Sequence, residues 1–115
     1  MTKEEILAME AGIELDGWVA EEVMGIKTLV RAGLITGEDE VPLLAYSEDI
    51  SAAWQVVEEM IKEYGDFIID YDAGYDGGNW IASTGKLSVE AMAGTAPEAI
   101  CKAALLAKME GVDNA

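Results

Sequence analysis

The chain has 115 residues, of which 23 are acidic and 7 are basic, so its formal net charge is −16. The apolar fraction of 51% is enough for one hydrophobic core, and the length predicts a single domain over residues 1–115. Histidine is absent and Cys101 is the only cysteine, which excludes a histidine–cysteine zinc site, a cysteine–histidine nucleophile and an internal disulfide. We therefore expect a protein that is not an enzyme and has no cofactor and no metal site.

The excess of carboxylates restricts the partners. Affinity for nucleic acid or an anionic membrane depends on lysine and arginine, so we expect no direct nucleic-acid binding and no membrane binding. No apolar run approaches the roughly 20 residues that span a bilayer. Residues 1–5 are unlike a signal peptide, which predicts a cytoplasmic location. The acidity fits either simple solubility or imitation of the DNA backbone.

The N-terminal part predicts two helices. Thr2 and Glu5 have the spacing of a capping box, which indicates a short first helix. A second amphipathic helix is expected between Glu14 and Gly25. Its apolar positions are Leu15, Trp18, Val19 and Val23, and its predicted exposed positions are Asp16, Glu21 and Glu22. Residues 26–31 fit a strand or a continuing helix, and residues 38–42 predict an exposed loop.

The clearest pattern predicts a helix that Ser47 or Asp49 caps and that Gly65 ends. Its apolar positions recur at helical spacing, which predicts that Trp54 is a core residue. The stripe consists of Ile50, Ala53, Trp54, Val57 and Ile61.

The C-terminal part predicts three strands followed by a helix. Alternating residues at 67–72, the segment 80–83 and alternating residues at 87–91 indicate the strands. Because the connections are short, these strands should pair as an antiparallel meander. Thr95 and Glu98 form a capping box with Pro97 in the first turn, and the helix that follows is so apolar that it must be covered on more than one side. The fold class expected is α+β.

Two segments together resemble the phage ABA sandwich domain family. They are residues 46–58, which read YSEDISAAWQVVE, and residues 95–107, which read TAPEAICKAALLA. Residues 5–9 and 15–25 are similar to the family too, so the resemblance covers most of the chain except residues 27–45. It implies an α/β/α sandwich with helices on both faces of a sheet, and a phage protein in the host cytoplasm. It carries over no catalytic residue, and Ile26 stands where many relatives have tryptophan.

Aromatic residues of the predicted hairpin are the first candidates for ligand binding. Tyr71, Tyr75 and Trp80 lie in or beside a glycine-rich turn, where their rings can stack on a planar ligand. For Trp80 packing within the hairpin is the favoured explanation, whereas Tyr75 is the ring that we expect to be exposed. Residues 70–76 are unlike a true calcium loop, because Tyr75 and Ile81 stand where that loop needs glycine and glutamate.

Helix starts and a pair of basic residues are the second group of candidates. Ser47 and Thr95 mark helix N-termini, whose N–H groups can hold a phosphate, although a capping role explains both residues. Lys27 and Arg31 are four residues apart and would share one face if this segment were helical. The alternative is scattered surface lysines.

Three functions remain open from the sequence. The phage resemblance, the aromatic residues and the helix starts favour sequestration of a small nucleotide-type ligand, which would counteract a host defence. The charge of −16 favours an acidic inhibitor or DNA mimic that binds a host defence protein. The apolar last helix favours a structural or assembly accessory protein without a ligand, and excess apolar surface predicts a homo-oligomer. The first of these is our working hypothesis.

Overall fold

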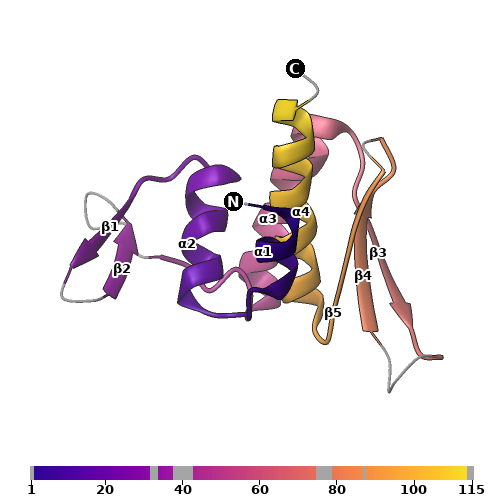
Figure 1. Ribbon diagram of the computed structural model, residues 1–115, viewed down its shortest axis with the longest axis horizontal. Coiled ribbons are helices and arrows are strands. Elements are labelled where there is room, and N and C mark those ends of the chain that lie inside the picture. Colours follow the sequence, from indigo (N-terminus) through magenta and orange to yellow (C-terminus); the bar gives the residue numbers. More distant parts are fainter. Residues whose placement is uncertain (1, 32–33, 38–42, 75–78, 87, 114–115) are drawn as a thin grey trace.

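The computed structural model describes residues 2–31, 34–37, 43–74, 79–86 and 88–113. In chain order its elements are α1 (Lys3–Ala8), α2 (Ile13–Glu22), β1 (Thr28–Arg31), β2 (Leu34–Gly37), α3 (Ile50–Tyr64), β3 (Ile68–Asp72), β4 (Asn79–Thr84), β5 (Val89–Ala93) and α4 (Ala96–Asp113). Figure 1 shows the β1–β2 hairpin at one end, the helices in the middle and the second sheet at the other end. No helix in these described ranges is long and apolar enough to cross a membrane.

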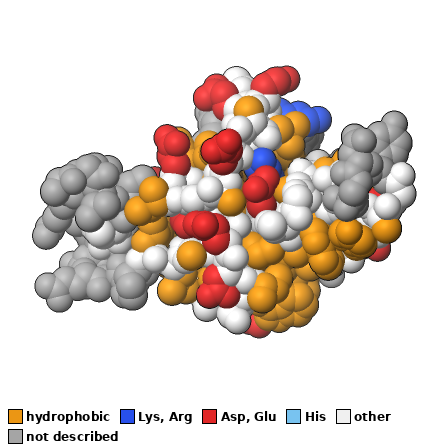
Figure 2. All heavy atoms as spheres, turned by 90° about the horizontal axis from the view of Figure 1, so that it is seen from below, with side chains coloured by type: hydrophobic (Ala, Val, Ile, Leu, Met, Phe, Trp, Pro, Cys, Tyr) orange, Lys and Arg blue, Asp and Glu red, His pale blue; other side chains and the backbone are white. Residues whose placement is uncertain are grey.

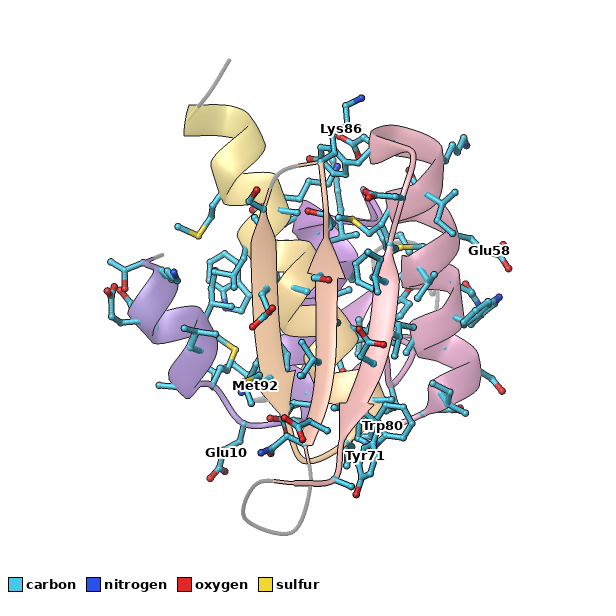
Figure 3. The ribbon with its side chains drawn as sticks, turned by 90° about the vertical axis from the view of Figure 1, so that its right-hand side faces the viewer. Glu10, Glu58, Tyr71, Trp80, Lys86 and Met92 are labelled. Atoms are coloured by element: carbon cyan, nitrogen blue, oxygen red, sulfur yellow. The ribbon has the colours of Figure 1, made fainter. Side chains whose placement is uncertain are left out.

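The second sheet is the predicted antiparallel meander. Its strand order is β3-β4-β5, and both pairings are antiparallel. The α+β class is therefore confirmed. Figures 1 and 3 show that the described helices cover one face of this sheet, whereas the resemblance implied helices on both faces. The uncovered face carries Asp70, Asp72 and Glu90, which are exposed and keep their hydration there.

The helix ends follow the predicted capping residues. Thr2 and Glu5 form a complete capping box at α1. At α3 the cap is Asp49, whose side chain accepts a hydrogen bond from the Ser51 N–H at 2.8 Å. Gly65 ends α3 in the left-handed region with φ of 89°, a conformation that glycine adopts without the steric cost of a Cβ.

The ambiguous segment after α2 forms a hairpin rather than a longer helix. Strands β1 and β2 pair antiparallel, with Thr28 opposite Gly37 and Arg31 opposite Leu34. Gly25, with φ of 70°, lies just beyond α2, and the β-branched Thr28 and Val30 favour an extended chain. Residues 38–42, which the sequence predicts as a loop, lie outside the described residues.

Helix α4 lies at the centre of the core. All of residues 99–107 are buried, and α4 contacts α1, α2, α3, β4 and β5. The predicted covering on more than one side is thus confirmed. Small side chains make this possible, because Ala103 and Ala104 let neighbouring elements approach the helix backbone closely.

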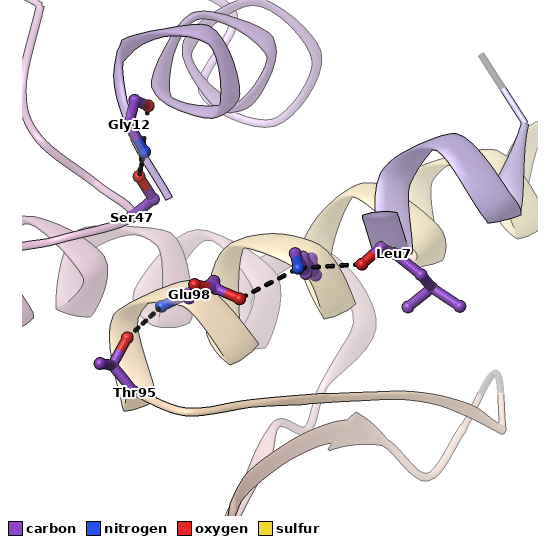
Figure 4. A network of polar contacts seen from close by, with 6 residues as sticks. Leu7, Gly12, Ser47, Thr95 and Glu98 are labelled. Atoms are coloured by element: carbon purple, nitrogen blue, oxygen red, sulfur yellow. Dashed lines mark hydrogen bonds and ion pairs between the residues drawn. The ribbon is translucent and has the colours of Figure 1, made fainter. Parts of the chain in front are cut away.

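A buried polar network joins α2 to the turn before α3. Asp16 was predicted to face water, but it is only 4% exposed, so that prediction is wrong. Its Oδ1 accepts hydrogen bonds from the Ser47 N–H at 2.8 Å and from the Ser47 hydroxyl at 2.6 Å. The Ser47 Oγ in turn accepts a hydrogen bond from the Gly12 N–H at 2.9 Å, as Figure 4 shows. These donors replace the water that the carboxylate loses on burial.

A second polar contact fixes α4 against α1. The Lys102 side chain is almost fully buried, and its Nζ donates to Glu98 Oε2 and to the Leu7 carbonyl, both at 3.0 Å. Figure 4 shows this chain of contacts running from the start of α4 to the end of α1. The lysine charge is therefore compensated inside the protein and does not face a ligand.

Candidate functional site

An open apolar groove lies between α3 and the sheet. Its volume is about 730 Å³. Helix α3 and the sheet form its walls, and the start of α4 completes it. The lining residues are Ile50, Trp54, Val57 and Ile61 of α3, Phe67, Ile69 and Trp80 of the sheet region, and Gly94, Thr95, Ala96 and Pro97. Figure 2 shows hydrophobic side chains gathered at the lower right of the view, whereas carboxylates are scattered over its middle and upper part.

The groove exists because α3 has two apolar faces. One face is buried and consists of Ala52, Ala53, Val56, Val57 and Met60. The other face runs along the groove and exposes its large residues: Ile50 is 52%, Trp54 51% and Ile61 45% exposed. The prediction of Trp54 as a core residue is therefore wrong. Small alanines face the packed interior, and α3 contacts α4 there, which places the larger side chains on the flank.

Two aromatic residues of the sheet lie next to each other beside this groove. Tyr71 and Trp80 are cross-strand partners in β3 and β4, with ring centroids 5.0 Å apart and planes inclined by 54°. Trp80 is half-buried and lines the groove, whereas Tyr71 is 52% exposed. Figure 3 shows both at the end of the strands that adjoins α3. Trp80 therefore packs within the hairpin and also forms part of the groove wall.

The start of α4 offers few donors for an anion. The first three residues of α4 are Ala96, Pro97 and Glu98. The Glu98 N–H already donates to Thr95 Oγ1 at 3.4 Å, and Pro97 has no N–H. Of these three residues, only Ala96 therefore keeps a backbone N–H that could donate to an anion. The Glu98 carboxylate lies in the same turn. The groove is thus better suited to an apolar or aromatic ring than to a phosphate.

The other predicted site residues lie away from the groove or outside the described part. The Ser47 side chain is fully buried in the Asp16 network, so its hydroxyl acts within the fold. Lys27 is exposed just before β1, and Arg31 ends that strand, so the helical face that was to unite them does not form. The Arg31 side chain and all of Tyr75 lie outside the described residues.

The sequence did contain a signal for the groove. The residues at positions 50, 54, 57 and 61 have helical spacing, and a second apolar row at 52, 53, 56 and 60 runs beside them. A helix with apolar residues over more than one stripe has either two covered sides or one open apolar side. The stripe with the tryptophan was assigned to the core because large apolar residues are the usual core residues.

Two further titratable side chains, those of Cys101 and Lys108, are engaged within the fold. Cys101 is fully buried, and burial raises the pKa of its thiol, with the Asp16 and Glu98 carboxylates adding to the rise, so the reactive thiolate is suppressed. Lys108 forms an ion pair with Glu63. No group of three or more cysteine or carboxylate side chains in the described ranges could hold a metal ion.

Fold and site together define a small α+β domain whose helices cover one side of an antiparallel meander and leave an apolar groove open. The model of the phage ABA sandwich domain family matches residues 17–105, which is most of the chain. The chain therefore belongs to the phage ABA sandwich domain family. It is also similar to a phage protein from Bacillus cereus ATCC 14579 with a 2.0 Å crystal structure. That comparison has a TM-score of 0.64 and 26% identity, and covers 85% of this chain and 91% of the other. No curated protein matches the chain.

Proposed function

We propose that this phage protein is a binding protein, not an enzyme, and that it counteracts a host defence by sequestering a small nucleotide-type ligand in the groove between α3 and the sheet. The observation that carries the proposal is the position of Trp54. A tryptophan that is 51% exposed in the wall of an apolar groove offers a stacking face to a planar ring. Trp80 supplies a second aromatic side chain in the same groove.

The dimensions and lining of the groove support a ligand of nucleotide size. Its volume of about 730 Å³ lies within the range of roughly 300 to 1,000 Å³ typical of small-molecule sites. Stacking of a base on an aromatic side chain contributes about 1–3 kcal/mol. Two tryptophans and an apolar wall can therefore supply part of the affinity without an ionic contact.

Charge determines which part of such a ligand dominates the affinity. The protein carries a net charge of −16, and the first turn of α4 offers little to an anion. Binding should therefore depend on the base and sugar, with the phosphates directed to solvent. Salt screens contacts between exposed charges, and such contacts contribute little to the affinity expected for this ligand. Affinity should therefore change little with salt concentration.

A ligand screen with matched tryptophan variants tests the proposal. Melting temperatures of the purified protein are measured with cyclic and linear nucleotides and with ADP-ribose derivatives. A nucleotide that binds the native state raises the melting temperature by mass action. Trp54→Ala should weaken binding about tenfold or more, which corresponds to the loss of one stacking contact.

Trp18→Ala is the control variant for this experiment. Trp18 is also partly exposed, at 37%, but it lies on α2 and does not line the groove. Its replacement should leave nucleotide affinity unchanged. If no nucleotide shifts the melting temperature, or if both variants weaken binding equally, sequestration in the groove is wrong.

A further inference from the structure

The uncovered face of the sheet presents a second surface, which we call the outer face. Strand alternation and the printed register place on it Ile68, Asp70 and Asp72 of β3, Asn79, Ile81 and Ser83 of β4, and Glu90 and Met92 of β5. In Figure 3 the sheet faces the viewer with the helices behind or beside it, so nothing in the described part of the chain covers this face. The groove, by contrast, lies on the inner side.

An apolar diagonal crosses all three strands of the outer face. Ile81 lies directly opposite Met92, and Ile68 lies opposite Ser83, one diagonal step from Ile81. Diagonal neighbours on a sheet are about 7–8 Å apart, which long side chains bridge. Ile68 is 45% and Met92 46% exposed. The three side chains thus form one apolar ridge in contact with water.

Carboxylates lie on both sides of this diagonal. Asp70 pairs with Ile81 and Asp72 with Asn79 on one side, and Glu90 pairs with Ser83 on the other. The described positions of the outer face carry no basic residue, and Lys86 lies beyond it in the turn after β4, as Figure 3 shows. The pattern is an apolar line with negative charge along both flanks.

This pattern fits a helix better than a second copy of the chain. A sheet face with large apolar residues is normally covered by another layer, and a helix carries one apolar stripe with polar residues on either side. A second copy would bring its own Asp70, Asp72 and Glu90 against the same residues, and each copy carries a charge of −16. Opposed like charges of this kind cost several kcal/mol.

We propose that the outer face docks an amphipathic helix of a partner protein whose apolar stripe is flanked on both sides by lysine or arginine. The apolar stripe packs on Ile68, Ile81 and Met92. The basic flanks pair with Asp70 and Asp72 on one side and with Glu90 on the other. The outer face is separate from the groove. A test that rejects helix docking therefore leaves nucleotide sequestration untouched, and a test that rejects sequestration leaves helix docking untouched.

A synthetic peptide tests the surface directly. The probe is an amphipathic helical peptide with a leucine stripe flanked by lysines, and its control has the same lysines with serine in place of leucine. Binding is measured by fluorescence anisotropy in about 50 mM and about 300 mM salt, because screening separates exposed charge contacts from apolar contacts. We expect the leucine peptide to bind at least about tenfold more tightly than the serine peptide, with affinity falling as salt rises.

Protein variants separate the outer face from the general acidity. Met92→Ser, Asp70→Asn and Glu90→Gln should each weaken binding of the leucine peptide about threefold or more. Glu58→Gln is the matched control, since Glu58 is an exposed carboxylate on α3 and lies away from the outer face, as Figure 3 shows. Equal binding of both peptides, or an equal loss in Glu58→Gln, would mean unspecific charge attraction and would overturn the proposal.

The same experiment detects a second copy as the true occupant. The mass of the wild-type protein and of Met92→Ser is measured by light scattering over a range of concentrations. A monomer that binds the peptide supports the proposal. A dimer that Met92→Ser dissociates would overturn it, and would assign the outer face to self-association instead.

Discussion

Helices α3 and α4 contact each other, yet they place their apolar residues in opposite ways. Helix α4 buries every residue from 99 to 107. Helix α3 buries its alanines and exposes about half of Ile50, Trp54 and Ile61. Half-exposed apolar side chains give up part of the free energy that full burial would provide, which is about 1.5–3 kcal/mol for one large apolar side chain. The central part of α4 is thus enclosed by the fold, whereas α3 has one enclosed face and one face open to the groove that the proposed function uses.

The largest effect should come from the buried face of α3. Met60 is fully buried, and Met60→Ala removes its contacts and leaves a cavity. We expect the free energy of unfolding to fall by about 2–5 kcal/mol. Urea unfolding followed by circular dichroism measures the change. A loss below about 1 kcal/mol would show that this face of α3 repacks easily and would remove the contrast with the groove face.

The next effect should come from the network that positions the start of α3. Ser47→Ala removes the hydroxyl that donates to Asp16 and accepts from Gly12, and leaves the buried carboxylate with one partner fewer. The expected loss of stability is about 1–3 kcal/mol. Ser51→Ala is the control in the same urea experiment, because Ser51 is exposed in the first turn of α3. Equal effects in both variants would make the network dispensable.

Cys101 tests whether α4 is closed to solvent. Burial, followed by the Asp16 and Glu98 carboxylates, raises the pKa of its thiol above the ordinary value of 9.0. The folded protein therefore keeps the neutral thiol at a pH where the unfolded chain releases the proton. The stability that the buried neutral thiol contributes is complete below pH 9.0 and is lost as the pH rises above it.

Melting temperatures between about pH 8 and pH 11 measure this loss, since linkage predicts a decline on the alkaline side. The decline should be less steep in Cys101→Ala than in the wild type. It should not vanish, because burial also raises the pKa of Tyr46. Iodoacetamide should label the thiol only after denaturation. Labelling of the folded protein at neutral pH would show that α4 opens.

Sequence patterns predicted the elements of this fold more reliably than the direction of individual side chains. The caps at Thr2, Asp49 and Gly65 depend on local hydrogen bonds and backbone conformation, and local sequence encodes these. The exposure of Trp54 and the burial of Asp16 depend on which face of a helix meets its neighbours. Because α3 carries two apolar rows, its sequence allows either row to face the core, and the contact with α4 determines which row is buried.

The candidate site was predictable only in part for the same reason. Trp80 and Thr95 were identified from a hairpin and a helix start, and the fold brings both to the groove. Ser47 resembled a helix cap, but a partner 31 residues away in the sequence takes its hydroxyl. Lys27 and Arg31 depended on a helix that the β1–β2 pairing replaces. The Ser47 difference comes from a contact between segments that are distant in the sequence, and the Lys27 and Arg31 difference comes from pairing with the next strand.

The smallest effect on stability should come from the exposed face of α3, and it is the most informative. Trp54→Ser removes a large side chain that is already half in water, so we expect the free energy of unfolding to change by no more than about 1 kcal/mol. Nucleotide affinity should nevertheless fall about tenfold or more. The same urea unfolding experiment gives the comparison with Met60→Ala. If Trp54→Ser destabilises the protein as strongly as Met60→Ala does, Trp54 is a structural residue, and the groove face of α3 is part of the core after all.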